Sequence, residues 1–141
     1  MKRWVTFLLL VFALHFGWEM LQADWFASMR DLPMLRAALL CMRAALGDLF
    51  ITAFAFAVAA FTVRSAIWPA ERRIIVPAAI FIGVAIAIVI AYEVFALSTG
   101  RWRYDEAMPT LFGIGLLPLL QWLVLPMAEL WVFRLIFRRA W

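Results

Sequence analysis

The chain has 141 residues, of which 68% are hydrophobic, and its mean hydropathy is +0.98. These values exclude an ordinary soluble domain and favour a protein embedded in lipid. The net charge is +4, but the basic residues stand at the ends of apolar runs, which favours membrane anchoring and predicts no nucleic-acid partner. The single cysteine, Cys41, excludes an internal disulfide and a paired-cysteine zinc site.

Four apolar stretches are each long enough to cross a bilayer as a helix, since a crossing takes about 20 residues. In chain order we expect them at 4–21, 47–63, 74–97 and 111–133. Backbone groups in lipid must be paired within their own segment, so we predict an all-α, integral membrane four-helix bundle that forms one domain over residues 1–141. The first run begins like a signal peptide but continues through His15 and Glu19 without a clear cleavage site, so we expect it to remain as a span.

The first span carries a polar stripe. Steps of three and four residues relate His15, Trp18, Glu19 and Gln22, which places them on one face of a helix. Ionisable groups inside a membrane span are costly and therefore indicate a functional site by default.

The segment between the first two spans is amphipathic. Helical spacing relates five apolar residues in it, namely Leu32, Leu35, Leu39, Met42 and Leu46. We describe residues 34–46 as an amphipathic outer segment, which either lies on the membrane surface or extends the second span outward without a break. The sequence leaves both arrangements open.

Basic residues predict the orientation of the chain. If both termini are cytoplasmic, the inner side carries eight of the 13 basic residues, among them Arg138 and Arg139. We therefore expect both the N-terminus and the C-terminus in the cytoplasm, and a multi-pass protein of a bacterial inner membrane.

The second and third spans each contribute an acid. Asp48 opens the second span, where Asp is also a common helix N-cap. Small side chains continue the face of Asp48 and permit close helix packing, at Thr52, Ala55, Ala59 and Thr62. Glu93 lies about one turn before the end of the third span. In the predicted orientation Glu19, Asp48 and Glu93 fall within about two turns of the outer boundary.

The fourth span contains Gln121 between Pro118 and Pro126. A proline inside a helix frees a carbonyl one turn earlier, and such helices occur beside cavities, so we expect a pocket there. The loop that precedes this span contains Trp102 and Tyr104 and is expected to form a lid over the pocket.

These residues favour acid–base chemistry in an apolar pocket, because a carboxylic acid kept from water stays protonated at neutral pH. We predict that Glu19 donates a proton and is oriented by His15. Asp48 is then its partner or base, and Glu93 is a second base. The predicted substrate-binding residues, whose aromatic members face a developing carbocation, are Trp18, Gln22, Trp102, Tyr104 and Gln121.

Each polar residue also has a purely structural interpretation. The three acids equally fit interfacial ion pairs with Arg36, Arg43, Arg101 or Arg103. Glu129 is expected to pair with inner-side arginines such as Arg134, without a chemical role. One histidine with three carboxylates matches no established metal-binding pattern, and we predict neither a metal nor a cofactor.

Several motifs resemble known membrane proteins. A group of small, uncharacterised bacterial four-helix membrane proteins resembles most of this chain, at His15–Gln22, Gly47–Asp48, Glu93, Gly100–Trp102, Tyr104, Met108–Pro109 and Gly113–Trp122. More distantly, Trp18–Glu19 with Asp48 is similar to integral-membrane terpene cyclases. Thr99–Gly100, Tyr104 and Gly115–Leu119 are similar to membrane carotenoid cyclases and hydratases. This second resemblance implies an acid that protonates an isoprenoid; those enzymes are longer, and a homodimer would supply the missing half.

Three functions therefore fit the sequence. The first is an intramembrane cyclase, isomerase or hydratase that acts on an isoprenoid or another membrane lipid. The second is a small proton-coupled transporter, and the third is an accessory or assembly subunit whose polar residues pack against partner helices. The expected partners are accordingly a membrane lipid, a second copy of the chain or another membrane protein.

Overall fold

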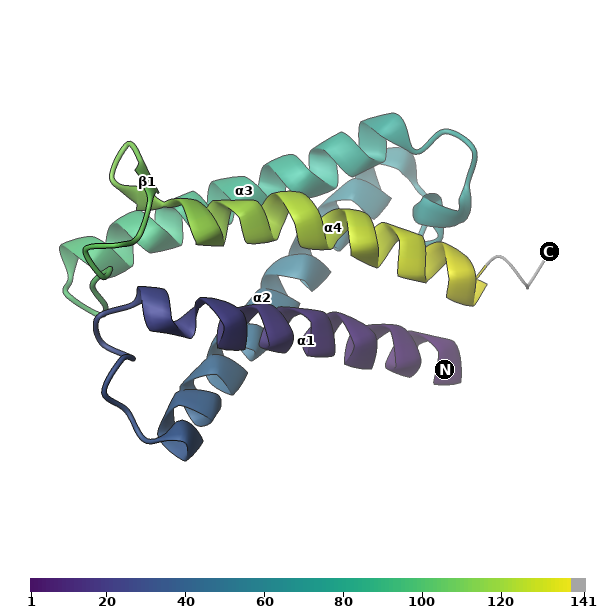
Figure 1. Ribbon diagram of the computed structural model, residues 1–141. Helices are drawn as coiled ribbons and strands as arrows, with labels where there is room; N and C mark the ends of the chain where they lie inside the picture. The colour runs from purple at the N-terminus through teal and green to yellow at the C-terminus, as the bar shows by residue number, and fades with distance from the viewer. Residues whose placement is uncertain (138–141) are drawn as a thin grey trace.

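The structure, a computed structural model, describes residues 1–137 as four long helices with short connections (Figure 1). The helices are α1 (Lys2–Gln22), α2 (Met34–Val63), α3 (Ile75–Ser98) and α4 (Leu116–Phe137), and two single-turn 3₁₀ helices, η1 (Ala23–Trp25) and η2 (Trp68–Ala70), follow α1 and α2. All four long helices have the length and apolar composition needed to cross a membrane. The predicted all-α membrane bundle with four candidate spans is thereby confirmed, and the chain is a multi-pass membrane protein.

Consecutive helices run in opposite directions, so the start of α1 and the end of α4 lie at the same end of the bundle (Figure 1). We call this end, which also carries residues 64–74, the terminal end. The opposite end carries residues 23–33 and 99–115 and is called the loop end. Both α1 and α3 pack mainly against α2 and α4. The orientation across the membrane stays a prediction, and Arg138 and Arg139 lie outside the described residues.

α2 is one unbroken helix, so residues 34–46 extend the second span and form no separate surface segment. Its 30 residues reach about 45 Å at ~1.5 Å per residue, which exceeds a hydrocarbon core of about 30 Å. In Figure 1, α2 crosses the other helices obliquely and its first turns diverge from α3 at the loop end. An amphipathic pattern is the same in a surface helix and in a span that continues past the lipid, so the pattern did not distinguish them.

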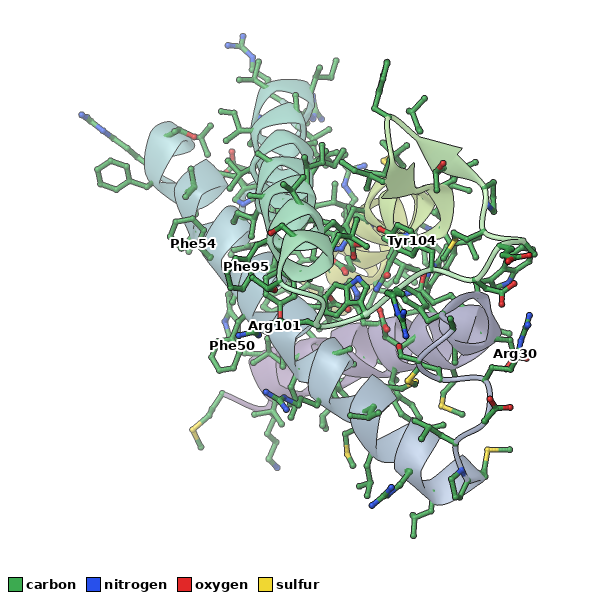
Figure 2. The ribbon with its side chains drawn as sticks, turned by 90° about the vertical axis from the view of Figure 1, so that its left-hand side faces the viewer. Arg30, Phe50, Phe54, Phe95, Arg101 and Tyr104 are labelled. Atoms are coloured by element: carbon green, nitrogen blue, oxygen red, sulfur yellow. The ribbon has the colours of Figure 1, made fainter. Side chains whose placement is uncertain are left out.

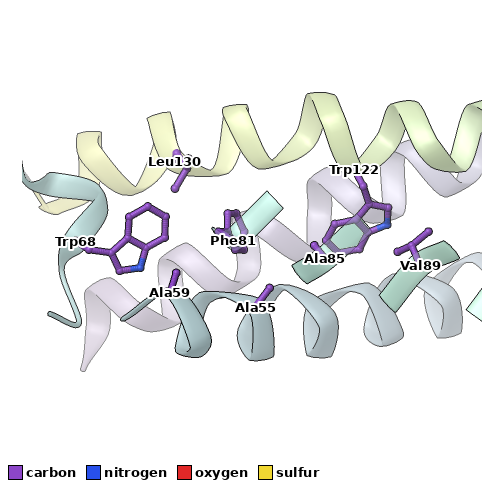
Figure 3. Packing of buried hydrophobic residues seen from close by; sticks show 8 residues of the cluster. All are labelled: Ala55, Ala59, Trp68, Phe81, Ala85, Val89, Trp122 and Leu130. Carbon is purple, nitrogen blue, oxygen red and sulfur yellow. The ribbon is translucent and has the colours of Figure 1, made fainter. Parts of the chain in front are cut away.

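Small residues allow α2 to approach its neighbours closely. Ala55 and Ala59 are fully buried and Thr52 nearly so, as the sequence predicted, whereas Thr62 is exposed near the end of the helix. Figure 3 shows the two alanines beside larger side chains from other elements, namely Trp68, Phe81, Trp122 and Leu130. This apolar cluster fills the interior between α2, α3 and α4.

The fourth helix begins at Leu116, later than predicted. Residues Thr110–Leu111 (β1) and Ile114–Gly115 (β2) instead pair as a small antiparallel hairpin. The two residues of its turn, Phe112 and Gly113, both have positive φ, at 52° and 81°, as in a type I′ turn. A right-handed helix excludes that conformation, so this apolar stretch belongs to the loop end.

Candidate functional site

A cavity of about 830 Å³ lies among the four helices near the loop end. Its wall includes all three acids singled out in the sequence, Glu19 on α1, Asp48 on α2 and Glu93 on α3. Residues 40–51 of α2 and 88–93 of α3 line it from two sides, where the oblique course of α2 separates these helices. The volume falls within the range of about 300–1,000 Å³ that is common for small-molecule sites.

Glu19 is held by Gln22, which lies one turn further along α1. Nε2 of Gln22 donates to Oε1 of Glu19 at 2.8 Å and to Oε1 of Gln121 on α4 at 3.3 Å. Nε1 of Trp18 donates to Oε1 of Gln22 at 3.1 Å, which fixes the direction of that amide. The polar stripe of the first span is therefore a connected network that reaches α4.

His15 is completely buried and lies between two carboxylates from other helices. Its Nε2 is 2.7 Å from Oε1 of Glu129, and its Nδ1 is 3.3 Å from Oδ2 of Asp48. Nε2 of Gln121 lies 3.0 Å from the same Nδ1 and donates to Oδ2 of Asp48 at 2.9 Å. The imidazole thus contacts Asp48 and Glu129. We expected it to orient Glu19, but both ring nitrogens point across the bundle to α2 and α4.

Glu129 belongs to the buried network, and the prediction that it pairs with Arg134 is wrong. Its side chain is only 1% exposed, whereas Arg134 donates to the backbone carbonyls of Pro69 at 2.6 Å and Glu71 at 3.3 Å. Glu129 and Arg134 are five residues apart, while helix residues that share a face are three or four apart. Glu129 lies eight residues after Gln121, and this spacing could have placed both on one buried face.

Glu93 accepts hydrogen bonds from the loop that precedes the hairpin. Nε1 of Trp102 donates to Oε2 of Glu93 at 3.3 Å, and the hydroxyl of Tyr104 donates to the same oxygen. Burial raises the pKa of Tyr104 above its ordinary value, and the hydrogen bond to Glu93 raises it further, so Tyr104 remains a neutral donor. The loop therefore presents two donors to one carboxylate of the cavity wall.

The two connections at the loop end are tied to each other. Arg30 forms an ion pair with Asp105 at 2.8 Å, and the backbone N–H of Ala27 donates to the carbonyl of Arg103. Figure 2, viewed from the loop end, shows Tyr104 beside the hairpin and Arg30 at the edge of the same end. Because Trp102 lies in the cavity wall, the loop covers one side of the cavity, which is where the sequence placed a lid.

Three of the five predicted substrate-binding residues line the cavity, namely Gln22, Trp102 and Gln121. Trp18 instead borders a separate cavity of about 160 Å³, and Tyr104 reaches the main cavity only through Glu93. Three further aromatic residues of the wall were not predicted, namely Phe26, Tyr92 and Trp122. Tyr92 and Trp122 each adjoin a predicted site residue in the chain, but helical neighbours point in different directions, so adjacency alone gave no signal.

The predicted interfacial ion pairs do not form in the described part of the chain. Within residues 1–137, none of the four arginines at positions 36, 43, 101 and 103 lies within ion-pair distance of Glu19, Asp48 or Glu93. Over the same residues, no group of three or more His, Cys, Asp or Glu side chains is arranged to hold a metal ion. The carboxylates are instead satisfied by amide, imidazole, indole and phenol groups.

No protein-family model, no curated protein and no solved structure matches the chain. The site itself consists of three carboxyl groups on three membrane helices, in the wall of one cavity, with a buried histidine behind them.

Proposed function

We propose that the cavity binds an isoprenoid or a similar membrane lipid, and that the carboxyl groups in its wall perform acid–base chemistry on this molecule. The observation that carries the proposal is that Glu19, Asp48 and Glu93, far apart in the sequence, line a single cavity inside a membrane bundle. Ionisable groups are costly inside membrane helices, which favours a functional reason for gathering three of them.

The rest of the cavity wall supports an amphipathic substrate. Its apolar part comes mainly from α2 and α3, with Leu40, Ile51, Ile88 and Val89. Leu40 lines the cavity and its side chain is half exposed, so the cavity is open at the surface of the bundle beside α2. A lipid chain can therefore enter from the bilayer while its reactive group meets the carboxyl groups of α1 and α2.

In the proposed reaction Glu19 is the acid. The amide of Gln22 donates to Oε1 of Glu19, which leaves Oε2 to carry the proton. That proton passes to one carbon of a substrate double bond and leaves a carbocation at the neighbouring carbon, beside the aromatic faces of Tyr92 and Trp102.

A base then completes the reaction. Asp48 or Glu93 takes a proton from a carbon next to the cation, and the electrons of that C–H bond form a new double bond. The product is an isomer or a cyclised form of the substrate with the same atoms, and the proton held by the base has to return to Glu19 before the next turnover. If water adds to the cation instead and gives one of its protons to the base, the product is an alcohol and the reaction is that of a hydratase.

The transporter and accessory alternatives have weaker support. A proton path across the membrane has to continue to the terminal end, yet the interior there is packed with Trp68, Phe81 and Leu130 (Figure 3). An accessory role places the carboxyl groups against partner helices, whereas here they face a cavity within the chain's own bundle.

Mass spectrometry of gently purified protein tests the proposal. We expect a bound isoprenoid or other lipid in the wild type, and its loss in Ala44→Phe, which fills the cavity from α2. Ala57→Phe, at an exposed position of the same helix, is the matched control and should keep the lipid. An identical lipid content in both variants, or a stoichiometric protein partner in place of a lipid, contradicts the proposal.

Activity is then tested on the lipid that is found. Glu19→Gln should retain the lipid but fail to convert it, and Asp48→Asn should do the same if Asp48, and not Glu93, is the base. Asp24→Asn, an exposed acid just beyond α1, should convert it as the wild type does. Conversion that persists in Glu19→Gln would show that Glu19 is not the acid of the reaction.

A further inference from the structure

The buried network extends beyond the cavity to a carboxyl group that the proposed reaction does not use. Asp48 contributes to the cavity wall and its side chain is 14% exposed, whereas His15 and Glu129 behind it are 0% and 1% exposed. Glu129 lies seven residues, or about 10 Å along α4, beyond Trp122, the last residue of α4 in the cavity wall. The series Asp48–His15–Glu129 therefore leads from the cavity into the closed interior.

Glu129, at the inner end of this series, has only part of its hydrogen-bonding capacity satisfied. Oε1 of Glu129 contacts His15, but Oε2 is buried and has no hydrogen-bond partner among residues 1–137. An ionised carboxylate with a bare oxygen is very unfavourable away from water, whereas a carboxyl group that carries a proton is much less so. The arrangement therefore suits a group that alternates between holding a proton and sharing one with its neighbour.

A single imidazole between two acids can pass a proton between them. Each ring nitrogen is either a donor or an acceptor, and His15 presents one nitrogen to each acid. A neutral imidazole that accepts a proton at one nitrogen while it releases one from the other keeps one of the two acids protonated and the other ionised.

We propose that Asp48, His15 and Glu129 form a proton relay that carries a proton from the cavity to a buried store on Glu129. In the forward step the proton leaves Oδ2 of Asp48 and binds Nδ1 of His15, while the proton on Nε2 of His15 moves to Oε1 of Glu129. Asp48 is left ionised, Glu129 neutral, and the imidazole changes from the Nε2–H to the Nδ1–H tautomer. The reverse step returns the proton to the cavity, and no other reactant is needed.

Gln121 controls access to the relay. Its Nε2 lies 3.0 Å from Nδ1 of His15 and 2.9 Å from Oδ2 of Asp48, closer than these two atoms are to each other at 3.3 Å. While this amide donates to Nδ1, it holds the imidazole in the Nε2–H tautomer and blocks transfer from Asp48. The relay operates when the amide turns away, and Gln121 is therefore a positioning residue.

The chain offers a direct measurement because His15 is its only histidine. Protein labelled with ¹⁵N-histidine and purified without a histidine tag, in lipid nanodiscs, gives one pair of ring-nitrogen NMR signals. We expect the wild type to show both neutral tautomers in exchange. Replacement of Gln121 by Leu should raise the share of the Nδ1–H tautomer by about tenfold, since the donor that opposes it is gone.

Glu129→Gln tests the store itself. The Gln oxygen still accepts from Nε2–H but cannot take up the proton, so the Nδ1–H tautomer should fall by about tenfold or more. Glu106→Gln, an exposed acid of the loop, is the matched control and should leave the tautomers unchanged. If Glu129→Gln does not yield folded protein, Asp48→Asn removes the acid at the cavity end and carries the same expectation.

Two results overturn the relay. One is a single fixed tautomer in the wild type at every pH between 5 and 9, and the other is an unchanged tautomer ratio in Glu129→Gln or Asp48→Asn. The relay does not depend on what the cavity binds, because the measurement needs no substrate. If no lipid is found in the cavity, the relay proposal is unaffected. If the NMR measurement contradicts the relay, the lipid proposal is likewise unaffected.

Discussion

At the scale of single residues, the site depends on close contacts between the loop end and the helices. Gly115 lies where the hairpin meets α4, and an added Cβ would lie 3.0 Å from two ring atoms of Tyr104 and 3.2 Å from Cδ of Pro118. The phenol ring needs this space to reach Glu93 from its loop. Glycine is required here by a close approach, and its backbone angles are not the reason.

Gly115→Ala should therefore displace Tyr104 and weaken its hydrogen bond to Glu93. We expect a loss of about 1–3 kcal/mol in the free energy of unfolding, as for other overpacked sites, measured by unfolding in detergent. Gly83→Ala is the control, since its added Cβ would meet nothing within 4 Å. Equal stability of the two variants would mean that Tyr104 shifts without cost.

Tyr104 also gives the fold a pH dependence. Its pKa is raised by burial and by the Glu93 hydrogen bond above the ordinary value of about 10. The folded state then holds the proton more tightly than the unfolded chain, so this stabilisation is complete below pH ~10 and is lost as the pH rises toward the folded value. Wild type should lose more stability above pH ~10 than Tyr104→Phe. Tyr92→Phe, which removes a half-exposed tyrosine, should behave as the wild type.

At the scale of the helices, α2 decides the shape of the cavity. Its buried alanines hold it close to the other helices toward the terminal end, and its oblique course opens the space near the loop end (Figures 1 and 3). The cavity therefore depends on small side chains that lie outside it.

Ala55→Leu should force α2 away from the packed cluster, because Ala55 is fully buried there. The expected cost is about 1–3 kcal/mol, measured as a lower midpoint of unfolding in detergent. Ala57→Leu makes the same chemical change at an exposed position of the same helix and should be nearly neutral. A similar loss in both variants would contradict the packing described here.

At the scale of the whole molecule, four spans place the start of α1 and the connection 64–74 at one end, opposite residues 23–33 and 99–115 (Figure 1). The excess of basic residues at the first of these ends predicts that it faces the cytoplasm. The cavity then lies nearer the outer side.

Labelling of intact cells with a membrane-impermeant maleimide tests this orientation. In a Cys41→Ser background, Ala27→Cys at the loop end should react and Ala66→Cys at the terminal end should not. Both alanines are exposed, so accessibility differs only through the membrane. Labelling of position 66 in place of position 27 would invert the predicted topology.

The class of the protein and many of its buried polar residues could be predicted from the amino-acid sequence. Apolar length alone identifies four membrane helices, because only a helix satisfies its own backbone in lipid. Ionisable groups are so unfavourable in such helices that Glu19, Asp48 and Glu93 could be singled out without coordinates, and all three line the cavity. Their predicted chemical roles stay predictions.

Which of these residues contact each other depends on how the helices pack. Helical spacing relates residues on one helix but says nothing of the angle at which helices cross. The cavity opens because α2, which includes residues 34–46, crosses the other helices obliquely. The partners of His15 lie 33 and 114 positions further along the chain, so no local pattern could connect it to Asp48 or Glu129. Glu129 looked like a boundary residue because it stands near an arginine in the sequence, whereas packing of α4 against α1 turns it inward.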